Sequence, residues 1–447
     1  MKIISCLRNY LPTHVAGTEI YVDALCKGLR QMGVETVIVK PGFDKKITEE
    51  YIYNQQKVIE YPQSSFNDID LITGNKTPTG LPGFKKVLEQ EKPDIIHFHE
   101  VSGSNGITTA HYEVAKSLQI PVFTTLHLVG YVCKTGMLQY KNKKDCDGVI
   151  KTYKCAVCTL YNRGVNSGLA EMAAATGMLL QQNNIAKGIL PKPLAGLLGY
   201  PKYINDHRKT LQYIFNESEK VFVLSHWFKE VLLRNSLPES KMVLLDKSLP
   251  HQLPALPFAV RPSTEKQPVR LIYLGRISKI KGLHLLLEAL NSITCTNWQL
   301  DIYGQTGEEA YEQYCKKLAH RNGAKIFFKN LLQPGEVLNA LQKYDALVCP
   351  TVIEEMVGFV VMEAFAAGLP VIGSDSKGIA EQLRNGVDGF LFKSGSASAL
   401  AHLLQKILEE PDILGTLKKN IIVPQSFEVV TKQVYHEYNI VAEKMSR

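Results

Sequence analysis

The sequence lacks several features that mark membrane, secreted or nucleic-acid-binding proteins. No run of about 18 consecutive apolar residues occurs, so we expect no membrane-spanning helix. The first residues, MKIISCLRNYLP, are interrupted too soon for a signal peptide and indicate a first strand instead. There is also no basic patch interleaved with aromatic residues that would stack bases, so we expect no nucleic-acid partner. The cytoplasm is therefore the expected compartment.

The composition is that of an ordinary globular protein. The chain has 447 residues, of which 45% are hydrophobic and 21% charged, and this length suits two or three domains. The net charge of +8 suits an anionic ligand or a peripheral contact with an anionic membrane surface, such as the inner face of a cell membrane.

Short apolar runs alternate with helical patterns through most of the chain. Because this alternation produces parallel, doubly wound sheets, we expect an α/β fold. In the first half we predict strands at 2–7, 35–40, 95–100, 121–126, 221–224 and 242–245. In the second half we predict strands at 269–274, 298–303, 325–328 and 345–349. Residues 44–80 are polar and poorly periodic, and we make no prediction for them.

A proline-rich linker divides the two halves. Five prolines fall between residues 250 and 268, in a segment without apolar periodicity. We therefore expect an N-terminal domain over 1–253 and a C-terminal domain over 254–426, followed by a final helix over 427–447.

Two glutamates stand out in residues 350–375. Glu363 lies in a helix predicted over Gly358–Ala367, and Glu355 lies on the loop before it. Met356–Phe359 would form the first turn, whose backbone N–H groups have no intrahelical partner and can bind an anion or a hydroxyl. The two carboxylates can instead be solvated surface charges, but one on so apolar a helix needs a partner or a ligand. The arrangement suits a phosphorylated sugar.

This stretch resembles the donor-site signature of glycosyltransferase family 4. The members of this family are retaining nucleotide-sugar transferases of GT-B architecture. The match covers both glutamates, the following Ala-x-x-x-Gly-x-Pro-Val-Ile, and residues 378–381 and 385–390. The resemblance implies two Rossmann-like domains that face each other across a cleft, with the last helix packing on the first domain. It also implies that Glu355, Met356, Val357, Gly358 and Phe359 surround the transferred sugar and that Glu363 holds the ribose. Met356 and Val357 stand where the family often has Pro-Phe or Asn-Phe.

A basic motif, Gly275-Arg276-x4-Lys281-Gly282, follows the predicted strand 269–274. Two cations with helix-end amides can neutralise a leaving diphosphate without a metal ion, although isolated surface bases would look the same. The family carries this motif in that role. The resemblance therefore implies that Gly275, Arg276 and Lys281 bind the donor and that catalysis requires no metal.

Three further positions are expected to contact the donor. The resemblance places Asn330 and Leu331, after strand 325–328, near the base. Gly17 precedes a helix that we expect Thr18 to cap, and Ala16-Gly17-Thr18-Glu19 partly matches the family's Gly-Gly-x-Glu near the diphosphate. Gly17 can equally be an ordinary turn glycine.

Histidines lie on one predicted strand of the first half and directly after another. His127 ends strand 121–126, where ligands bind in parallel sheets, and the resemblance implies that it reaches the transferred sugar. A histidine satisfied within the core is the alternative. His97 and His99 project from one face of their strand, a spacing that suits either a metal or one core and one rim histidine.

Four of the nine cysteines cluster between residues 133 and 158, at Cys133, Cys146, Cys155 and Cys158. The gaps between them are twelve, eight and two residues. A long segment without apolar periodicity needs a cross-link to hold its structure. Four thiols can form a closed tetrahedral zinc site, although the first two gaps are not standard. Free thiols, disulfides and a redox pair are the alternatives.

The sequence predicts a retaining glycosyltransferase that moves a sugar from a nucleotide-diphosphate sugar to a glycan, lipid-linked or small-molecule acceptor. Surface polysaccharide or glycoconjugate synthesis is the expected context. A nucleotide-sugar epimerase of the same architecture and a non-catalytic sugar-nucleotide-binding subunit are the alternatives. The apolar stretch 177–200 suits core packing, a partner or a membrane contact.

Overall fold

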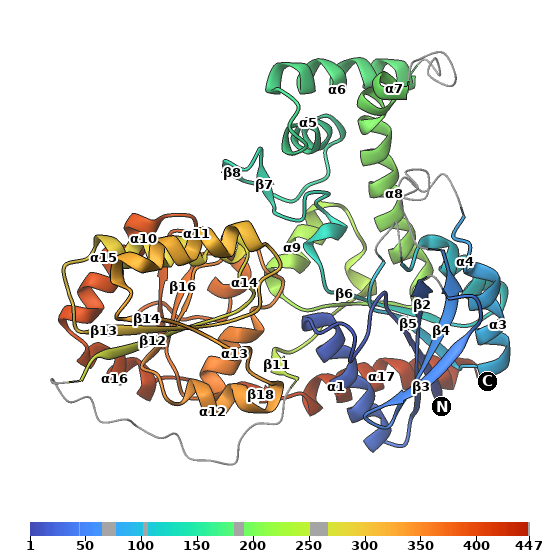
Figure 1. Ribbon diagram of the computed structural model, residues 1–447. Coiled ribbons are helices and arrows are strands. Elements are labelled where there is room, and N and C mark those ends of the chain that lie inside the picture. Colours follow the sequence, from blue (N-terminus) through green and yellow to red (C-terminus); the bar gives the residue numbers. More distant parts are fainter. Residues whose placement is uncertain (44, 65–76, 102–105, 183–191, 251–266, 446–447) are drawn as a thin grey trace. The chain divides into compact units, whose positions relative to one another are not determined.

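The computed structural model describes residues 1–43, 45–64, 77–101, 106–182, 192–250 and 267–445. The chain divides into two compact units (Figure 1): unit 1 comprises Met1–Asp246 and Phe427–Arg447, and unit 2 comprises Lys247–Ser426. The domain boundary predicted between residues 253 and 254 falls in 251–266, outside the described residues.

Unit 1 is built on an eight-stranded sheet of order β10-β9-β6-β5-β1-β2-β4-β3. Its strands are β1 (Lys2–Cys6), β2 (Glu35–Phe43), β3 (Glu49–Tyr53), β4 (Gln56–Gln63), β5 (Ile95–Phe98), β6 (Val122–Leu126), β9 (Lys220–Val223) and β10 (Met242–Leu244). All neighbours pair in parallel except β3 and β4. The antiparallel β3–β4 pair occupies the stretch for which the sequence carried no prediction.

The described helices of unit 1 are α1 (Gly17–Gln31), α3 (Leu81–Glu91), α4 (Thr109–Ser117), α5 (Thr152–Asn162), α6 (Ser167–Gln182), α7 (Lys192–Leu198), α8 (Tyr200–Glu217), α9 (His226–Arg234) and α17 (Glu428–Met445). The expected cap of α1 is wrong, because the helix already begins at Gly17 and Thr18 lies inside it. Ala16, in an extended conformation, is the N-cap residue and makes no side-chain cap bond. The final helix, α17, belongs to unit 1.

Helix α17 is built into the core of unit 1. It buries Val430, Val434 and Tyr438, and the Tyr438 hydroxyl lies 2.5 Å from His97 Nδ1. A Cβ atom on Gly28 of α1 would come within 2.6 Å of Thr431 Oγ1, so the absence of a side chain at residue 28 permits the close approach of α1 and α17.

Between β6 and α8 the chain leaves the sheet. It forms η1 (Val129–Tyr131), a small hairpin of β7 (Gln139–Tyr140) and β8 (Lys144–Asp145), and then α5 to α7. The cysteine-bearing excursion shows no apolar periodicity in the sequence, but residues 152–162 form α5. Ala156, Val157 and Leu160 are buried there, within a span too short for the sequence pattern to reveal.

Unit 2 is built on a six-stranded parallel sheet of order β14-β13-β12-β15-β16-β17. Its strands are β12 (Val269–Leu274), β13 (Trp298–Tyr303), β14 (Ile326–Lys329), β15 (Ala346–Cys349), β16 (Val371–Ser374) and β17 (Gly389–Phe392). Its described helices are α10 (Leu283–Ser292), α11 (Glu309–Ala319), α12 (Val337–Leu341), α13 (Phe359–Ala366), α14 (Lys377–Ala380), α15 (Ala397–Glu409) and α16 (Asp412–Lys419). A short pair, β11 (Ser248–Leu249) with β18 (Gln425–Ser426), lies where the chain enters and leaves the unit.

Helices cover both faces of this sheet, as the doubly wound prediction requires (Figure 1). On β12, Leu271 and Tyr273 belong to a core cluster with residues of α10, α11 and α15, whereas Ile272 belongs to a second cluster with residues of α12 and α13. This alternation follows from the pleat of a strand, which sends successive side chains to opposite faces.

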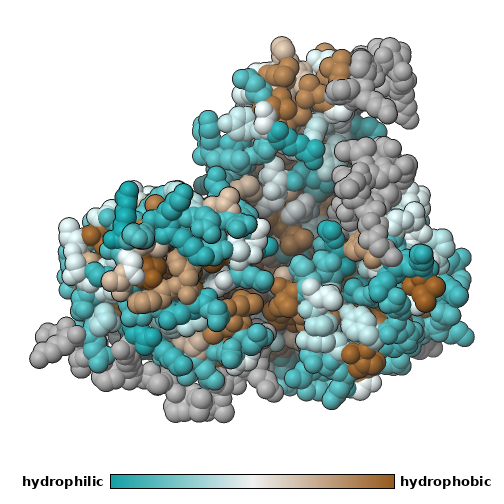
Figure 2. Space-filling model, viewed as in Figure 1, coloured by the Kyte–Doolittle hydropathy of each residue, from teal (hydrophilic) through white to brown (hydrophobic). Residues whose placement is uncertain are grey.

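No helix among the described residues is long and apolar enough to span a membrane. Part of the apolar stretch 177–200 lies in 183–191, outside the described residues. On α6, apolar side chains are at the surface (Figure 2), with Met172 63% exposed, Leu179 60% and Leu169 46%. Packing within the core therefore does not account for all of this region's apolar residues.

Candidate active site

The order of strands in unit 2 reverses between β12 and β15. From β12 the chain moves outward through β13 to β14, and β15 to β17 then extend the other edge. The loops that follow β12 and β15 thus leave the same end of two adjacent parallel strands and diverge. Open α/β sheets bind ligands in the crevice at such a point. Lys281 comes from the first loop and Glu355 from the second, as their positions in the sequence require.

Lys281 and Glu355 form an ion pair at this reversal. Lys281 Nζ lies 2.7 Å from Glu355 Oε1, and the Glu355 side chain is only 12% exposed. Burial by itself lowers the pKa of Lys281, but the Glu355 carboxylate outweighs burial and the pKa lies above its ordinary value. Lys281 is therefore a cation that the Glu355 carboxylate positions at the carboxyl ends of β12 and β15.

The two loops are also joined through their backbones. Val352 N donates to Ile280 O at 2.9 Å, and Thr351 Oγ1 donates to the same carbonyl at 3.1 Å. Gly282 has a φ of +71°, and a Cβ there would lie 1.9 Å from Pro350 O. Residue 282 must be glycine for the loops to meet in this way.

Helix α14 presses on the Glu355 loop from the other side. A Cβ on Gly378 would lie 2.0 Å from Glu355 O, and Lys377 N donates to Glu354 Oε2 at 2.5 Å. The carboxylate of Glu355 is thus carried on a loop fixed by both neighbouring turns.

Helix α13 begins later than predicted. Its first residue is Phe359 and its N-cap is Gly358, so Met356 and Val357 belong to the loop and do not form a helical turn. Glu363 lies within the helix, as expected, and is partly exposed among buried neighbours. Met356 is buried, while Val357 and Phe359 pack against Leu249, Met362 and Ala366, so these two side chains serve the core of unit 2.

The remaining donor positions lie around the same end of the sheet. Gly275 and Arg276 directly follow β12, and Arg276 is exposed. Among the described residues we find no side-chain hydrogen bond or ion pair of Arg276. Asn330 and Leu331 follow β14 at the edge of the sheet, and both are exposed.

In unit 1 the strand order reverses between β1 and β5. Gly17 opens the helix after β1, and His99 directly follows β5. His127 follows β6, is 8% exposed, and its Nε2 lies 3.3 Å from His99 Nδ1. Burial lowers the pKa of His127 to about 3, so the imidazole is neutral at physiological pH. It can offer a hydrogen bond at this site but no charge.

His97 and His99 have different surroundings although both are fully buried. Both ring nitrogens of His97 have partners, Tyr438 and Thr125, which makes His97 a core residue. His99 Nε2 is buried without a hydrogen-bond partner among the described residues. His99 is therefore a candidate site residue together with His127. The spacing of His97 and His99 in the sequence does not show which of the two has this role.

Two other residues lie near this end of unit 1: Tyr21, which the sequence analysis did not single out, and Glu19, which it named only as part of the partial Gly-Gly-x-Glu match. The ring of Tyr21 stands edge-on to His127 with 4.8 Å between centroids, and its buried hydroxyl has no partner among the described residues. Glu19 is buried; burial raises the pKa of its carboxyl, and His14 Nδ1 lies 3.0 Å from Oε1. Tyr21 looked like an ordinary core position of an amphipathic helix, so no sequence pattern distinguished it.

Two family models match the chain. Residues 15–148 match Glycosyltransferase Family 4, and residues 259–422 match the glycosyl transferases group 1 model. The chain belongs to the group 1 glycosyltransferases. The two matches fall one on each unit and include every predicted donor residue and His127.

Curated relatives of this glycosyltransferase match it over part of their length. An uncharacterized glycosyltransferase of Methanocaldococcus jannaschii is 29% identical over 184 residues, which are 40% of this chain and 46% of that protein. A glycogen synthase of Mycobacterium tuberculosis is 33% identical over 159 residues, 35% of this chain and 37% of that protein. The chain thus spans about half or less of the length of these relatives.

Solved structures resemble the glycosyltransferase over nearly its whole length. Sucrose-phosphate synthase from Thermosynechococcus elongatus gives a TM-score of 0.69 at 17% identity and covers 99% of both chains. Anabaena HepE, solved in complex with UDP and glucose, gives 0.60 at 14% identity and covers 100% of this chain and 99% of that one. At these identities the likeness establishes the fold, which is GT-B.

The four clustered cysteines of the glycosyltransferase lie in the excursion of unit 1, away from its sheet. Cys133 follows η1, Cys146 follows β8, and Cys155 and Cys158 lie on α5. All four are free thiols and line one cavity. As the side chains stand, no group of three His, Cys, Asp or Glu residues in the described part of the chain is arranged to hold a metal ion.

Proposed function

We propose that this protein transfers a sugar from a nucleotide-diphosphate sugar, bound by unit 2, to an acceptor. The observation that carries the proposal is the Lys281–Glu355 ion pair at the point where the strand order of unit 2 reverses. A fixed cation and a carboxylate at that point suit a ligand with a diphosphate and sugar hydroxyls.

The proposed chemistry is cleavage of the bond between the anomeric carbon and the diphosphate. Negative charge grows on the leaving diphosphate oxygen as this bond breaks. Lys281 and Arg276 neutralise that charge, and the backbone N–H groups at the start of α13 donate to the same ligand. Because two cations supply this stabilisation, the proposed reaction uses no metal ion.

The other donor contacts divide by the part of the ligand that they meet. Glu363, on α13, accepts hydrogen bonds from the ribose hydroxyls, and Glu355 orients the transferred sugar. Gly275 leaves room for the diphosphate after β12, while Asn330 and Leu331 lie beside the base. We further propose that the product retains the anomeric configuration of the donor, as the family resemblance implies.

We propose that unit 1 binds the acceptor. We also propose that His127 forms a hydrogen bond with a hydroxyl of the transferred sugar. A neutral imidazole can accept or donate one hydrogen bond at each nitrogen, and His99 already lies beside Nε2. The exposed apolar side chains of α6 favour a lipid-linked acceptor at the inner face of the cell membrane over a soluble one. Co-sedimentation with vesicles of anionic phospholipid tests this, and a chain that stays in the supernatant argues for a soluble acceptor.

The donor hypothesis is tested by a thermal-shift panel of nucleotide-diphosphate sugars with the free nucleotides as controls. A true donor binds the native state and raises the melting temperature in a concentration-dependent way. The hit is then incubated with the protein in the absence of acceptor. Slow release of free sugar and nucleoside diphosphate supports a transferase, and a sugar-isomerised donor identifies an epimerase. Binding without any turnover, with or without an acceptor extract, identifies a binding subunit.

A further inference from the structure

The cavity in the excursion of unit 1 gathers an unusual set of metal-binding groups. All four clustered thiols line it, and so does His207 of α8. They come from four separate places in the chain: the turn after η1, the end of the β7–β8 hairpin, the first two turns of α5, and α8. The fold, not the sequence spacing, brings them together.

Hydrogen-bond donors lie beside two of these sulfur atoms, although burial raises the pKa of Cys158 and raises that of Cys155 to about 11, so a bound cation would be needed to hold the thiolates. Lys141 N donates to Cys158 Sγ at 3.3 Å, and Asn162 Nδ2 donates to the same sulfur at 3.5 Å. Thr135 Oγ1 lies 3.2 Å from Cys133 Sγ. Lys134 and Lys154 also line the cavity, and Lys154 Nζ lies 3.0 Å from Asp147 Oδ1. Backbone and side-chain donors aimed at sulfur are the outer contacts that structural metal sites require.

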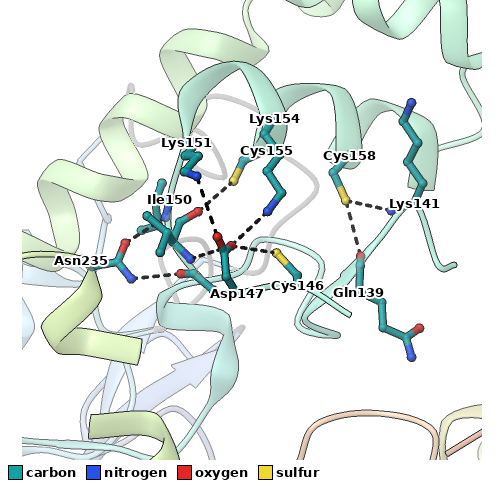
Figure 3. A network of polar contacts seen from close by, with 12 residues as sticks. Gln139, Lys141, Cys146, Asp147, Ile150, Lys151, Lys154, Cys155, Cys158 and Asn235 are labelled. Carbon is teal, nitrogen blue, oxygen red and sulfur yellow. Dashed lines mark hydrogen bonds and ion pairs between the residues drawn. The ribbon is translucent and has the colours of Figure 1, made fainter. Parts of the chain in front are cut away.

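Two of the thiols are held only weakly where they stand. Cys155 Sγ contacts Val149 O at 4.0 Å, and Cys146 Sγ contacts Asp147 Oδ1 at 3.6 Å (Figure 3). Both contacts need the thiol proton and are lost on deprotonation. The Sγ atom of a cysteine is placed by one torsion, χ1, so a change of staggered rotamer can reposition the sulfur without moving the backbone.

His207 supplies an independent observation. Its Nε2 is buried and has no hydrogen-bond partner among the described residues, which costs free energy unless something in the cavity meets it. With its proton on Nε2, the ring can donate one hydrogen bond from that atom. A thiolate of a metal cluster is a suitable acceptor.

The hairpin of the excursion is small, and the ion pair of Lys141 with Glu171 of α6, at 2.8 Å, is one of its few polar contacts with the helices. Strands β7 and β8 have two residues each, and a hairpin of that size is marginal in water without a tether. Cys133 and Cys146 bracket this hairpin, while Cys155 and Cys158 lie three residues apart on one face of α5. A shared ion would tie the hairpin to the helix.

We propose that Cys133, Cys146, Cys155 and Cys158 bind one structural zinc ion as four thiolates, with His207 Nε2–H donating to the cluster. The formal charge of such a cluster is −2, and Lys134 and Lys154 line its cavity. The ion has four protein ligands and no open position, so its role is to hold the hairpin against α5 and it takes no part in sugar transfer.

The test starts from untagged protein purified under reducing conditions without added metal. Elemental analysis is expected to give about one zinc per chain, and a mercurial thiol reagent is expected to release it in step with about four thiols. Reconstitution with Co²⁺ is expected to give the intense absorption of tetrahedral cobalt with four thiolates. Weaker bands typical of mixed sulfur and nitrogen ligands would overturn the four-thiolate assignment.

Cys146→Ser and Cys295→Ser form a matched pair, since both residues are half-buried free thiols and Cys295 lies in unit 2. The zinc content of Cys146→Ser is expected to fall at least about tenfold, whereas that of Cys295→Ser is expected to stay at the wild-type level. Wild-type protein with four titratable thiols in this region that takes up neither Zn²⁺ nor Co²⁺ would overturn the proposal. So would intact-mass evidence that these cysteines are paired as disulfides in freshly purified protein.

Discussion

At the scale of single residues, Lys281 is held by an oppositely charged partner. Glu355 both holds the Lys281 ammonium at 2.7 Å and keeps it protonated. The same carboxylate is proposed to meet the transferred sugar. The two side chains are therefore expected to act as a unit, so single substitutions of the pair will not be additive.

Replacing Lys281 with alanine removes a cation proposed to meet the leaving diphosphate and leaves Glu355 without its partner. Turnover is expected to fall by about two to three orders of magnitude, comparable to the loss of an oxyanion-hole donor. Single-turnover kinetics with the identified donor measure this. Lys279→Ala is the control, because Lys279 is an exposed cation on the same short helix. Near-normal turnover of a folded Lys281→Ala variant would refute the assigned role.

Glu355→Gln and Glu363→Gln are expected to fail in different ways. Glu363 is proposed to bind the ribose equally in the ground and transition states, so its loss raises the donor KM more than it lowers turnover. Glu355 is proposed to lie beside the reacting sugar, so its loss is expected to lower turnover while donor affinity changes little. Donor titration and single-turnover rates separate the two. Intact donor affinity in Glu363→Gln, or an intact chemical step in Glu355→Gln, would contradict these roles.

At the scale of elements, the site depends on turns that admit no side chain. Gly282→Ala places a Cβ at a φ of +71° and within 1.9 Å of Pro350 O, so the β12 and β15 loops must move apart. We expect a stability loss of more than about 1 kcal/mol together with weaker donor binding. Gly307→Ala is the matched control, since no atom lies within 4 Å of its added Cβ. Equal melting temperatures and donor affinities for the two variants would mean that the loops do not meet as described.

Helix α4 contains His111, which the folded protein holds in its neutral form. Thr108 N donates to His111 Nδ1 at 3.1 Å, and His111 Nε2 lies 2.9 Å from the Tyr61 hydroxyl. Burial lowers the pKa of His111 to about 3, below its value in the unfolded chain. The stabilisation is therefore complete above about pH 6.5 and is lost as the pH falls toward 3.

His111 should accordingly contribute a fall of about 1.4 kcal/mol in unfolding free energy for each pH unit below about 6.5. Denaturant unfolding between pH 7 and 5 measures this slope. The slope is expected to be smaller in His111→Gln and unchanged in His402→Gln, whose residue is exposed. Parallel profiles for wild type and His111→Gln would show that His111 does not titrate in this way.

At the scale of the whole molecule, the sequence predicted the two doubly wound sheets because alternating runs specify parallel strands. The same alternation predicted that Lys281 and Glu355 lie at the same end of the sheet of unit 2, although they are 74 residues apart in the sequence. Local detail was less predictable: Gly17, not Thr18, opens α1, and α13 starts at Phe359. These boundaries depend on backbone geometry that residue types alone do not fix.

Other features depend on contacts between distant elements. The pairing of His99 with His127 and the gathering of four thiols and His207 around one cavity follow from how elements pack. No periodicity within a segment reports such contacts. The predicted roles of the site residues remain predictions for the experiments above.

The packing of α17 predicts that a substitution near the end of the chain destabilises unit 1. Tyr438→Ala removes a fully buried ring and the hydroxyl partner of His97, at a cost of about 3–5 kcal/mol. Limited proteolysis followed by mass spectrometry should show faster cleavage in unit 1 and little change in unit 2. His436→Ala, at an exposed position of the same helix, is the control. Equal acceleration in both units would contradict the division of the chain.

The return of α17 has a consequence for biosynthesis. Unit 2 is one continuous segment, whereas unit 1 needs residues that follow unit 2 in the chain. On the ribosome, where domains usually fold in the order of synthesis, the first 246 residues emerge without the helix that fills their core. Unit 1 can therefore complete its core only after unit 2 has been synthesised, while all of the residues of unit 2 are already present. We therefore expect a chaperone that binds nascent apolar segments to bind the part of unit 1 that precedes unit 2 in the chain.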